Sequence, residues 1–303
     1  MTKLHAALTF LLGLLLFPVS LLCADGRELG TGFELHQGMI FLQASIGDSE
    51  PLQMALDSGS KRTTLDEALA RKMGLDLSMK ARSSGANGIQ EISVVRDQLL
   101  GIGGVSVPVP LMLVYPLDFL SKKIGHRLDG IVGVELLRHF VVRIDYTNRQ
   151  LSLMQPASFS YSGAGQVLPV TYHDGLPLVP GSLILFGRDP IQTRFQLDTG
   201  SGVAYVNFWK AFVEKHQLLS GARELADTEM TGFGGSKAGK KGRIKALQIG
   251  QTTLPEPEVG FCDWSFGDPG VFGGNVGNRF FRLFNVTFDL PHDRLILEDA
   301  GAK

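Results

Sequence analysis

Two short segments of the chain repeat one chemical pattern, in which an Asp is followed by a hydroxyl residue, a Gly and a Ser. In chain order they are Asp57-Ser58-Gly59-Ser60 and Asp198-Thr199-Gly200-Ser201. A single copy is ordinary turn composition, because Asp, Ser and Gly are all common turn residues. Two copies at matching places in one chain indicate that the carboxylates of Asp57 and Asp198 act as a catalytic pair.

A pair of carboxylates has a well-defined chemistry. When they lie about 3 Å apart they cannot both be charged, so they share one proton and their coupled pKa values split. One carboxylate can then take a proton from water while the other donates a proton to a carbonyl oxygen, and this chemistry needs neither a metal nor a covalent intermediate. Because the titration belongs to the pair, neither Asp57 nor Asp198 is assigned one role.

The residues after each Asp are expected to support the two catalytic loops. They are Ser58, Gly59 and Ser60 in the first copy, and Thr199, Gly200 and Ser201 in the second. The hydroxyl residue next to each Asp is expected to hydrogen-bond across an approximate twofold axis. The glycines allow backbone N–H groups to approach the carboxylates. The closing serines are placed beside the outer carboxylate oxygens.

The segments around the two copies also match, which indicates a duplicated chain. An alternating apolar run precedes each Asp, as in a strand that ends in a Gly turn. Downstream, Gly130-Ile131-Val132-Gly133 in the first half corresponds to Gly274-Asn275-Val276-Gly277 in the second. Each is followed by a short helix candidate and then by a strand that ends at an Asp, Asp145 or Asp289.

These motifs resemble the aspartic proteases. The run Gly130–Asp145 is especially similar to the bacterial retropepsin-like aspartyl proteases. The resemblance covers nearly all of the chain after residue 35, in two tandem copies. It implies a mostly β, two-lobed pepsin-like (acid protease) fold, built from two retropepsin-like β-barrel repeats with short helices.

The chain divides into an N-terminal lobe at 33–154, a linker at 155–166 and a C-terminal lobe at 167–299. The expected short helices are Asp66–Met73, Val134–His139, Asn207–His216 and Asn278–Leu283. A Gly-rich hairpin lies between the Asp and the Gly-x-Val-Gly segment of each half, at 83–89 and 231–236. By the resemblance, the first hairpin is the flap over a bound peptide, with Gly85, Asn87 and Gly88 as flap candidates.

Residues 1–24 have the composition of a secretory signal. Lys3 precedes a long apolar run, and Ala24 offers a small residue for cleavage. The run also approaches the length of a membrane span, so a retained anchor is the alternative. We therefore expect a secreted or periplasmic protein, membrane-anchored only if this segment stays uncleaved. Without it only Cys262 remains, so an internal disulfide is excluded.

Composition argues against several other classes of function. The net charge of −1 gives no basis for nucleic-acid binding. Lys237, Lys240, Lys241, Arg243 and Lys245 form a basic patch that is interpreted as a solvated loop. No metal-ligand spacing is found among the histidines, so neither a metal nor another cofactor is expected.

The sequence therefore predicts an aspartic endopeptidase with a peptide or protein substrate, acting as a monomer. The alternative is a catalytically silent protein- or peptide-binding module on the same fold, because a fold by itself does not establish activity.

Overall fold

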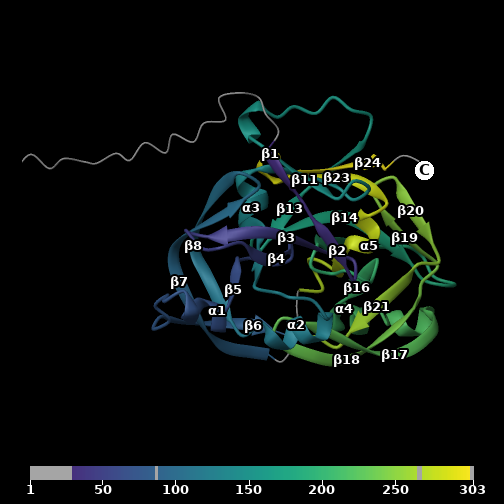
Figure 1. Cartoon of the computed structure of the whole chain (residues 1–303). Helices are drawn as coiled ribbons and strands as arrows, with labels where there is room; N and C mark the ends of the chain where they lie inside the picture. The colour runs from purple at the N-terminus through teal and green to yellow at the C-terminus, as the bar shows by residue number, and fades with distance from the viewer. Residues whose placement is uncertain (1–28, 86–87, 265–267, 301–303) are drawn as a thin grey trace, which may run out of the picture.

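The computed structural model describes residues 29–85, 88–264 and 268–300 (Figure 1). The predicted signal at 1–24 and the flap candidate Asn87 lie outside the described residues. Strands dominate the fold and the helices are short, which confirms the prediction of a mostly β protein. The strands form three sheets, of which one is built from each half of the chain and the third is shared.

The shared six-stranded sheet joins the two halves. Its order is β1 (Leu29–Gly32), β11 (Gln150–Met154), β10 (Val141–Asp145), β23 (Phe284–Asp289), β24 (Arg294–Asp299) and β12 (Gln166–Pro169). Strand β10 of the first half pairs antiparallel with β23 of the second, with Ile144 opposite Val286. Figure 1 shows this sheet across the top of the molecule. The halves are therefore linked by continuous backbone hydrogen bonding as well as by side-chain packing.

The first half forms an eight-stranded sheet. Its order is β2 (Glu34–His36), β3 (Met39–Ile46), β4 (Leu52–Leu56), β9 (Gly130–Val132), β5 (Thr64–Asp66), β8 (Val105–Tyr115), β7 (Gly88–Ile102) and β6 (Lys80–Gly85). Strands β4 and β9 run parallel, so the residue after β4 is placed at the end of β9.

The second half forms a ten-stranded sheet with a related arrangement. Its order is β17 (Arg223–Gly232), β18 (Gly235–Arg243), β21 (Glu258–Cys262), β16 (Val206–Phe208), β22 (Gly274–Val276), β15 (Ile191–Leu197), β14 (Leu176–Ile184), β19 (Ala246–Ile249) and β20 (Thr252–Pro255), with β13 (Thr171–His173) paired to β14. Here β15 and β22 are the parallel pair.

The helices follow the sequence signals with some differences. They are α1 (Glu67–Lys72), α2 (Asp118–Ile124), α3 (Val134–His139), α4 (Lys210–Lys215) and α5 (Asn278–Phe281), with the 3₁₀ turns η1 (Pro156–Ser158), η2 (Leu218–Gly221) and η3 (Leu290–His292). Asp66 caps α1 by accepting a hydrogen bond from the Leu69 N–H. The prediction that the helix observed as α4 begins at Asn207 was wrong, because Val206–Phe208 pair as a strand instead.

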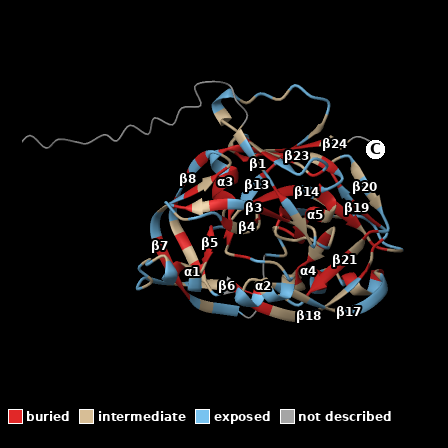
Figure 2. Ribbon diagram, in the orientation of Figure 1, coloured by how far each residue is buried: buried red, intermediate tan, exposed pale blue. Residues whose placement is uncertain are grey.

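The apolar core is continuous through both halves. Leu56, Leu197, Val142 and Phe288 are fully buried members of one cluster, although they belong to different sheets. Figure 2 shows buried residues along the central strands and exposed ones along β17. Among the described helices, none is both long and apolar enough to cross a membrane.

Candidate active site

Each Asp lies directly after an interior strand of the sheet of its own half. The backbone N–H of Asp57, after β4, donates to Val132 O at 2.9 Å, and that of Asp198, after β15, donates to Val276 O at 3.0 Å. The parallel β4–β9 and β15–β22 pairs fix these bonds. The same local architecture thus presents a carboxylate at the same position in both halves.

Four hydrogen bonds cross-link the two loops. The Ser58 N–H donates to Thr199 Oγ1 at 2.9 Å, and the Thr199 N–H donates to Ser58 Oγ at 3.0 Å. The two hydroxyls then donate to strand carbonyls of the opposite half, Ser58 to Leu197 O and Thr199 to Leu56 O, both at 2.9 Å. Both side chains are fully buried. The chain thus joins its two halves directly beneath the carboxylates.

The glycines hold the carboxylates close to the opposite loop. A Cβ added to Gly200 would lie 2.5 Å from Asp57 Cγ, and one added to Gly59 would lie 2.7 Å from Asp198 Cγ. Only a residue without a side chain fits here. Each Gly N–H also donates to the Asp of its own loop, at 2.8 Å for Asp57 Oδ1 and 2.9 Å for Asp198 Oδ1.

The two carboxylates interact with each other in surroundings that disfavour charge. Burial raises the pKa of Asp57 well above its usual value, and the negative charge of Asp198 raises it further. Burial also raises the pKa of Asp198, whereas a hydrogen bond from the Asn275 side chain opposes that rise. Both residues keep some accessible surface. The geometry therefore provides a reachable pair of carboxylates that holds a proton at pH values where an isolated Asp is ionised.

Two amide side chains contact the loops, and the sequence analysis assigned them no function. Gln196 Nε2 donates to Gly59 O at 3.2 Å, and Asn275 Nδ2 donates to Asp198 Oδ2. The sequence did distinguish Asn275, because this polar residue stands where the first copy carries the apolar Ile131.

The serines that end the two motifs have partners other than the carboxylates. Ser60 Oγ donates to Arg62 O at 2.8 Å, and Ser201 Oγ accepts from Asn207 Nδ2 at 3.0 Å. Their backbone N–H groups are directed at Asp57 and Asp198 and lower the pKa of each. Each serine therefore acts on its Asp through the main chain in this structure.

A buried glutamate lies beneath the first loop. Glu135, only 5 % exposed at the start of α3, accepts from the Thr63 N–H at 3.0 Å through Oε2. Its Oε1 lies 3.7 Å from the Arg62 guanidinium. Burial raises the pKa of the Glu135 carboxyl, and Arg62 only partly offsets this. Keeping Glu135 ionised therefore lowers the free energy of unfolding.

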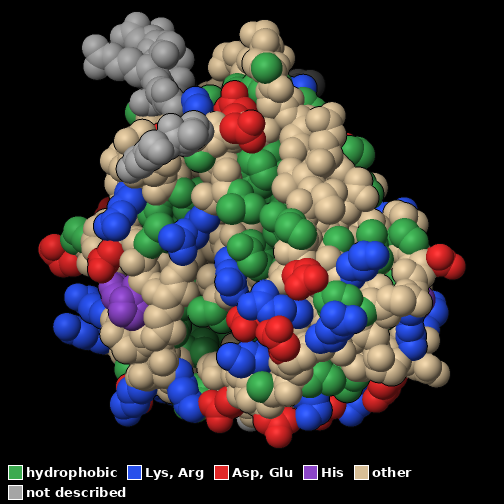
Figure 3. All heavy atoms as spheres, turned by 90° about the vertical axis from the view of Figure 1, so that its right-hand side faces the viewer, with side chains coloured by type: hydrophobic (Ala, Val, Ile, Leu, Met, Phe, Trp, Pro, Cys, Tyr) green, Lys and Arg blue, Asp and Glu red, His purple; other side chains and the backbone are tan. Residues whose placement is uncertain are grey.

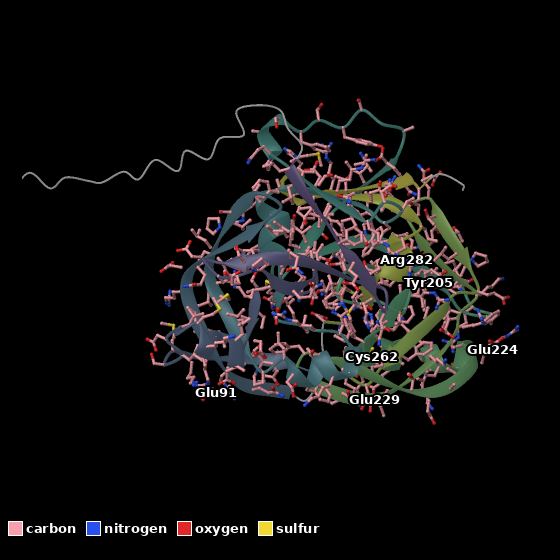
Figure 4. All side chains as sticks on the ribbon, in the orientation of Figure 1. Glu91, Tyr205, Glu224, Glu229, Cys262 and Arg282 are labelled. Carbon is pink, nitrogen blue, oxygen red and sulfur yellow. The ribbon has the colours of Figure 1, made fainter. Side chains whose placement is uncertain are left out.

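Glu135→Gln is expected to stabilise the folded protein at neutral pH, with a gain that disappears in acid. Because the folded pKa lies above the unfolded one, the protonated carboxyl stabilises the fold at low pH, and this contribution is lost as pH rises through the folded pKa. Melting temperatures from about pH 4 to about pH 8 test this. Glu91→Gln, an exposed site on β7 (Figure 4), is the matched control. A destabilised Glu135→Gln protein at neutral pH would contradict the expectation.

The two Gly-rich hairpins meet at their tips. Gly85 of the predicted flap packs against the second hairpin so closely that a Cβ there would lie 2.6 Å from Phe233 O. Gln90 Nε2 donates to Gly234 O at 3.2 Å, and the Tyr115 ring lies 4.3 Å from that of Phe233. Gly88, the other described flap candidate, has a φ of +96° that favours glycine. The two halves thus touch here as well as at the Asp loops.

Ion pairs neutralise most of the basic patch, which lies largely on strand β18. Lys123 Nζ of α2 lies 2.5 Å from Oε1 of Glu229 on β17, and Figure 4 labels Glu229. Further pairs join Lys240 to Asp227, Lys241 to Glu258 and Arg243 to Glu224. Figure 3 shows basic and acidic side chains interspersed over the face that it presents. The described part of the chain has no cluster of side chains placed to hold a metal ion.

Part of the first half matches a known protein family. The family model described as aspartyl protease matches residues 42–136, which include Asp57 and the Gly133 segment. No curated protein matches the chain. The match supports a general aspartic protease function. The segment 42–136 is therefore similar to the aspartyl proteases, in agreement with the resemblance of the first copy, and no match covers the second copy around Asp198.

Proposed function

We propose that the protein is an aspartic endopeptidase that hydrolyses peptide bonds with a water activated between Asp57 and Asp198. The observation that carries this proposal is the reciprocal fit of the two loops, in which Gly59 abuts Asp198 and Gly200 abuts Asp57. Such a fit supports one reacting centre shared by both carboxylates. The family match in the first half supports the same reaction class.

In the proposed reaction the pair starts with one proton. The ionised carboxylate takes a proton from water, and the water oxygen bonds to the peptide carbonyl carbon. The carbonyl oxygen receives the proton of the other carboxyl, which gives a neutral tetrahedral diol. When the C–N bond breaks, the nitrogen takes the proton gained from water, and one diol hydroxyl returns its proton to the pair. No metal or further cofactor takes part.

The proposed architecture is the two-lobed pepsin-like one, with lobes at 33–154 and 167–299 joined by 155–166. The division of strands into one sheet per half and one shared sheet supports it. The meeting of the hairpins at Gly85 and Phe233 supports a substrate site enclosed from both halves. Since one chain supplies both carboxylates, a monomer suffices. We further propose that residues 1–24 direct the protein to the periplasm or outside the cell, or anchor it there.

The test is digestion of a diverse peptide mixture from about pH 3 to about pH 8, because one proton on the pair should give a bell-shaped rate profile. We expect cleavage that falls away on both sides of an optimum and that an inhibitor mimicking the tetrahedral diol suppresses. A folded protein that cuts no peptide at any pH, yet binds such peptides, would instead indicate a silent binding module.

A further inference from the structure

The two Asp residues have matched backbone surroundings but different side chains on the neighbouring strand. Each carboxylate accepts from the N–H of the Gly in its own loop. In the first half, Ala55 on β4 pairs with Ile131 on β9, and both belong to an apolar cluster. At the same register in the second half, Gln196 on β15 pairs with Asn275 on β22. The first half therefore serves as an internal comparison for the second, because only the second half has amide side chains at these two positions.

Only Asn275 of these four residues reaches a carboxylate. Its Nδ2 donates to Asp198 Oδ2, and the residue is 4 % exposed, so the bond is shielded from water. Its Oδ1 is buried without a hydrogen-bond partner among the described residues. An unpaired buried acceptor disfavours the folded state. Packing alone therefore favours an apolar residue here, as at Ile131, and the amide requires another explanation.

We propose that Asn275 is a positioning residue that makes the pair asymmetric, because its amide bonds to Asp198 alone and so keeps the shared proton on Asp57. Asp198 is then the carboxylate that accepts the proton of the attacking water, and Asp57 is the acid that protonates the carbonyl oxygen. This assignment rests on the proposed function and adds the direction in which the protons move.

Two titratable groups interact with Asp198 in the described structure. Asp57 faces it from the other loop. The Cys262 thiol faces it from the end of β21 (Figure 4), and burial together with the Asp198 charge raises the pKa of Cys262 to about 12. Since the thiol stays neutral in acid, changes in the titration there belong to the two carboxylates.

The hydrogen bond from Asn275 to Asp198 predicts which of the two apparent pKa values of the pair depends on Asn275. It stabilises every state in which Asp198 is ionised, namely the singly protonated and the fully ionised pair. Loss of the donor therefore raises the lower apparent pKa, at which the first proton leaves. The upper apparent pKa, at which Asp57 loses its proton, changes little, because Asp198 is ionised on both sides of that step. General damage to the site would not move one step alone.

The first measurement compares single carboxylates by NMR of protein labelled with ¹³C at the Asp side-chain carboxyl. In Asp57→Asn the remaining Asp198 is expected to titrate about one pH unit below Asp57 in Asp198→Asn, since only Asp198 has the extra donor. This comparison needs no peptide cleavage, so it succeeds or fails independently of the proposed function. Equal pKa values for the two remaining carboxyls, or a higher pKa for Asp198 than for Asp57, would overturn the assignment.

The second measurement uses Asn275→Leu, which keeps the approximate shape of the side chain and removes the donor. The lower apparent pKa of the pair, and with it the acid limb of the cleavage profile, is expected to rise by about one pH unit while the basic limb stays in place. The melting temperature should be unchanged or higher, because the unpaired Oδ1 is also removed. Asn207→Leu is the matched control, since Asn207 donates to Ser201 and not to a carboxylate.

A folded Asn275→Leu protein whose lower apparent pKa is unchanged, or falls, would overturn the proposal. A fall would mean that the side-chain oxygen of Asn275 accepts from a protonated Asp198. If the expected shifts are found by NMR but the wild type cleaves no peptide, the asymmetry stands and the proposed endopeptidase activity fails.

Discussion

Replacing either Asp57 or Asp198 with Asn is expected to abolish peptide cleavage. Asn has nearly the shape of Asp but can neither take a proton from water nor pass one to the carbonyl oxygen. General acid–base catalysis contributes about 10²–10⁴-fold, and loss of one carboxylate removes both functions of the pair at once. We therefore expect a fall of about 10⁴-fold in kcat/KM for each variant, measured on the best peptide from the mixture.

The same variants should gain stability at neutral pH. Both carboxyls have pKa values raised by burial, and that of Asp57 also by the charge of Asp198. A raised folded pKa stabilises the protein below the unfolded pKa, and this contribution is lost as pH rises through the folded pKa. Asn removes the cost of ionising a buried carboxyl, so the melting temperatures of the variants at pH 7 should equal or exceed that of the wild type. Inactive variants that are also unfolded would leave the catalytic assignment unsupported, and active ones would contradict it.

Much of the site could be predicted because it depends on local sequence repeated twice. An alternating strand, an Asp and a Gly turn specify where a carboxylate is presented, whatever the rest of the chain does. The repeated run ending at Gly133 and Gly277 supplies the neighbouring strand in each half. The hydroxyl residues Ser58 and Thr199 were expected to bond across the two loops, and the structure contains those bonds.

Other features depend on how the halves are arranged relative to each other, which no local pattern encodes. The hairpin around Gly85 was predicted from its turn residues, but its contact with Phe233 requires both halves to be in place. The pairing of Ile144 with Val286 likewise joins strands from distant parts of the chain. Helix α2, which was not predicted, begins after Leu117 without a side-chain cap, whereas Asp66 caps α1.

Asn275 shows a different limit. Its position in the repeat was visible, but a polar residue in a predicted central strand has no assigned partner until the strand register is known. Register places it opposite Gln196 and beside Asp198. Sequence comparison of the two halves therefore finds the exception, and three-dimensional structure is needed to explain it.

The cross-link between the loops should be the most sensitive structural element of the site. Thr199 Oγ1 accepts from the Ser58 N–H and donates to Leu56 O, and the Thr199 side chain is fully buried. Thr199→Val keeps the shape of the side chain but leaves both partners unpaired. At about 1–3 kcal/mol for each unsatisfied group, the free energy of unfolding should fall by about 2–6 kcal/mol, measured by denaturant titration. Cleavage should fall as well, because the loops carry the carboxylates.

The chain itself supplies the matched control for this prediction. The first half has Ser at the equivalent position, so Thr199→Ser retains the hydroxyl and both of its hydrogen bonds and should lose much less stability than Thr199→Val. If the two variants were equally stable, loss of the hydroxyl in Thr199→Val would cost no more than loss of the methyl group in Thr199→Ser, and the four bonds would not be what joins the halves. A loss confined to Thr199→Val would instead show that the hydrogen bonds beneath Asp57 and Asp198 hold the two halves together.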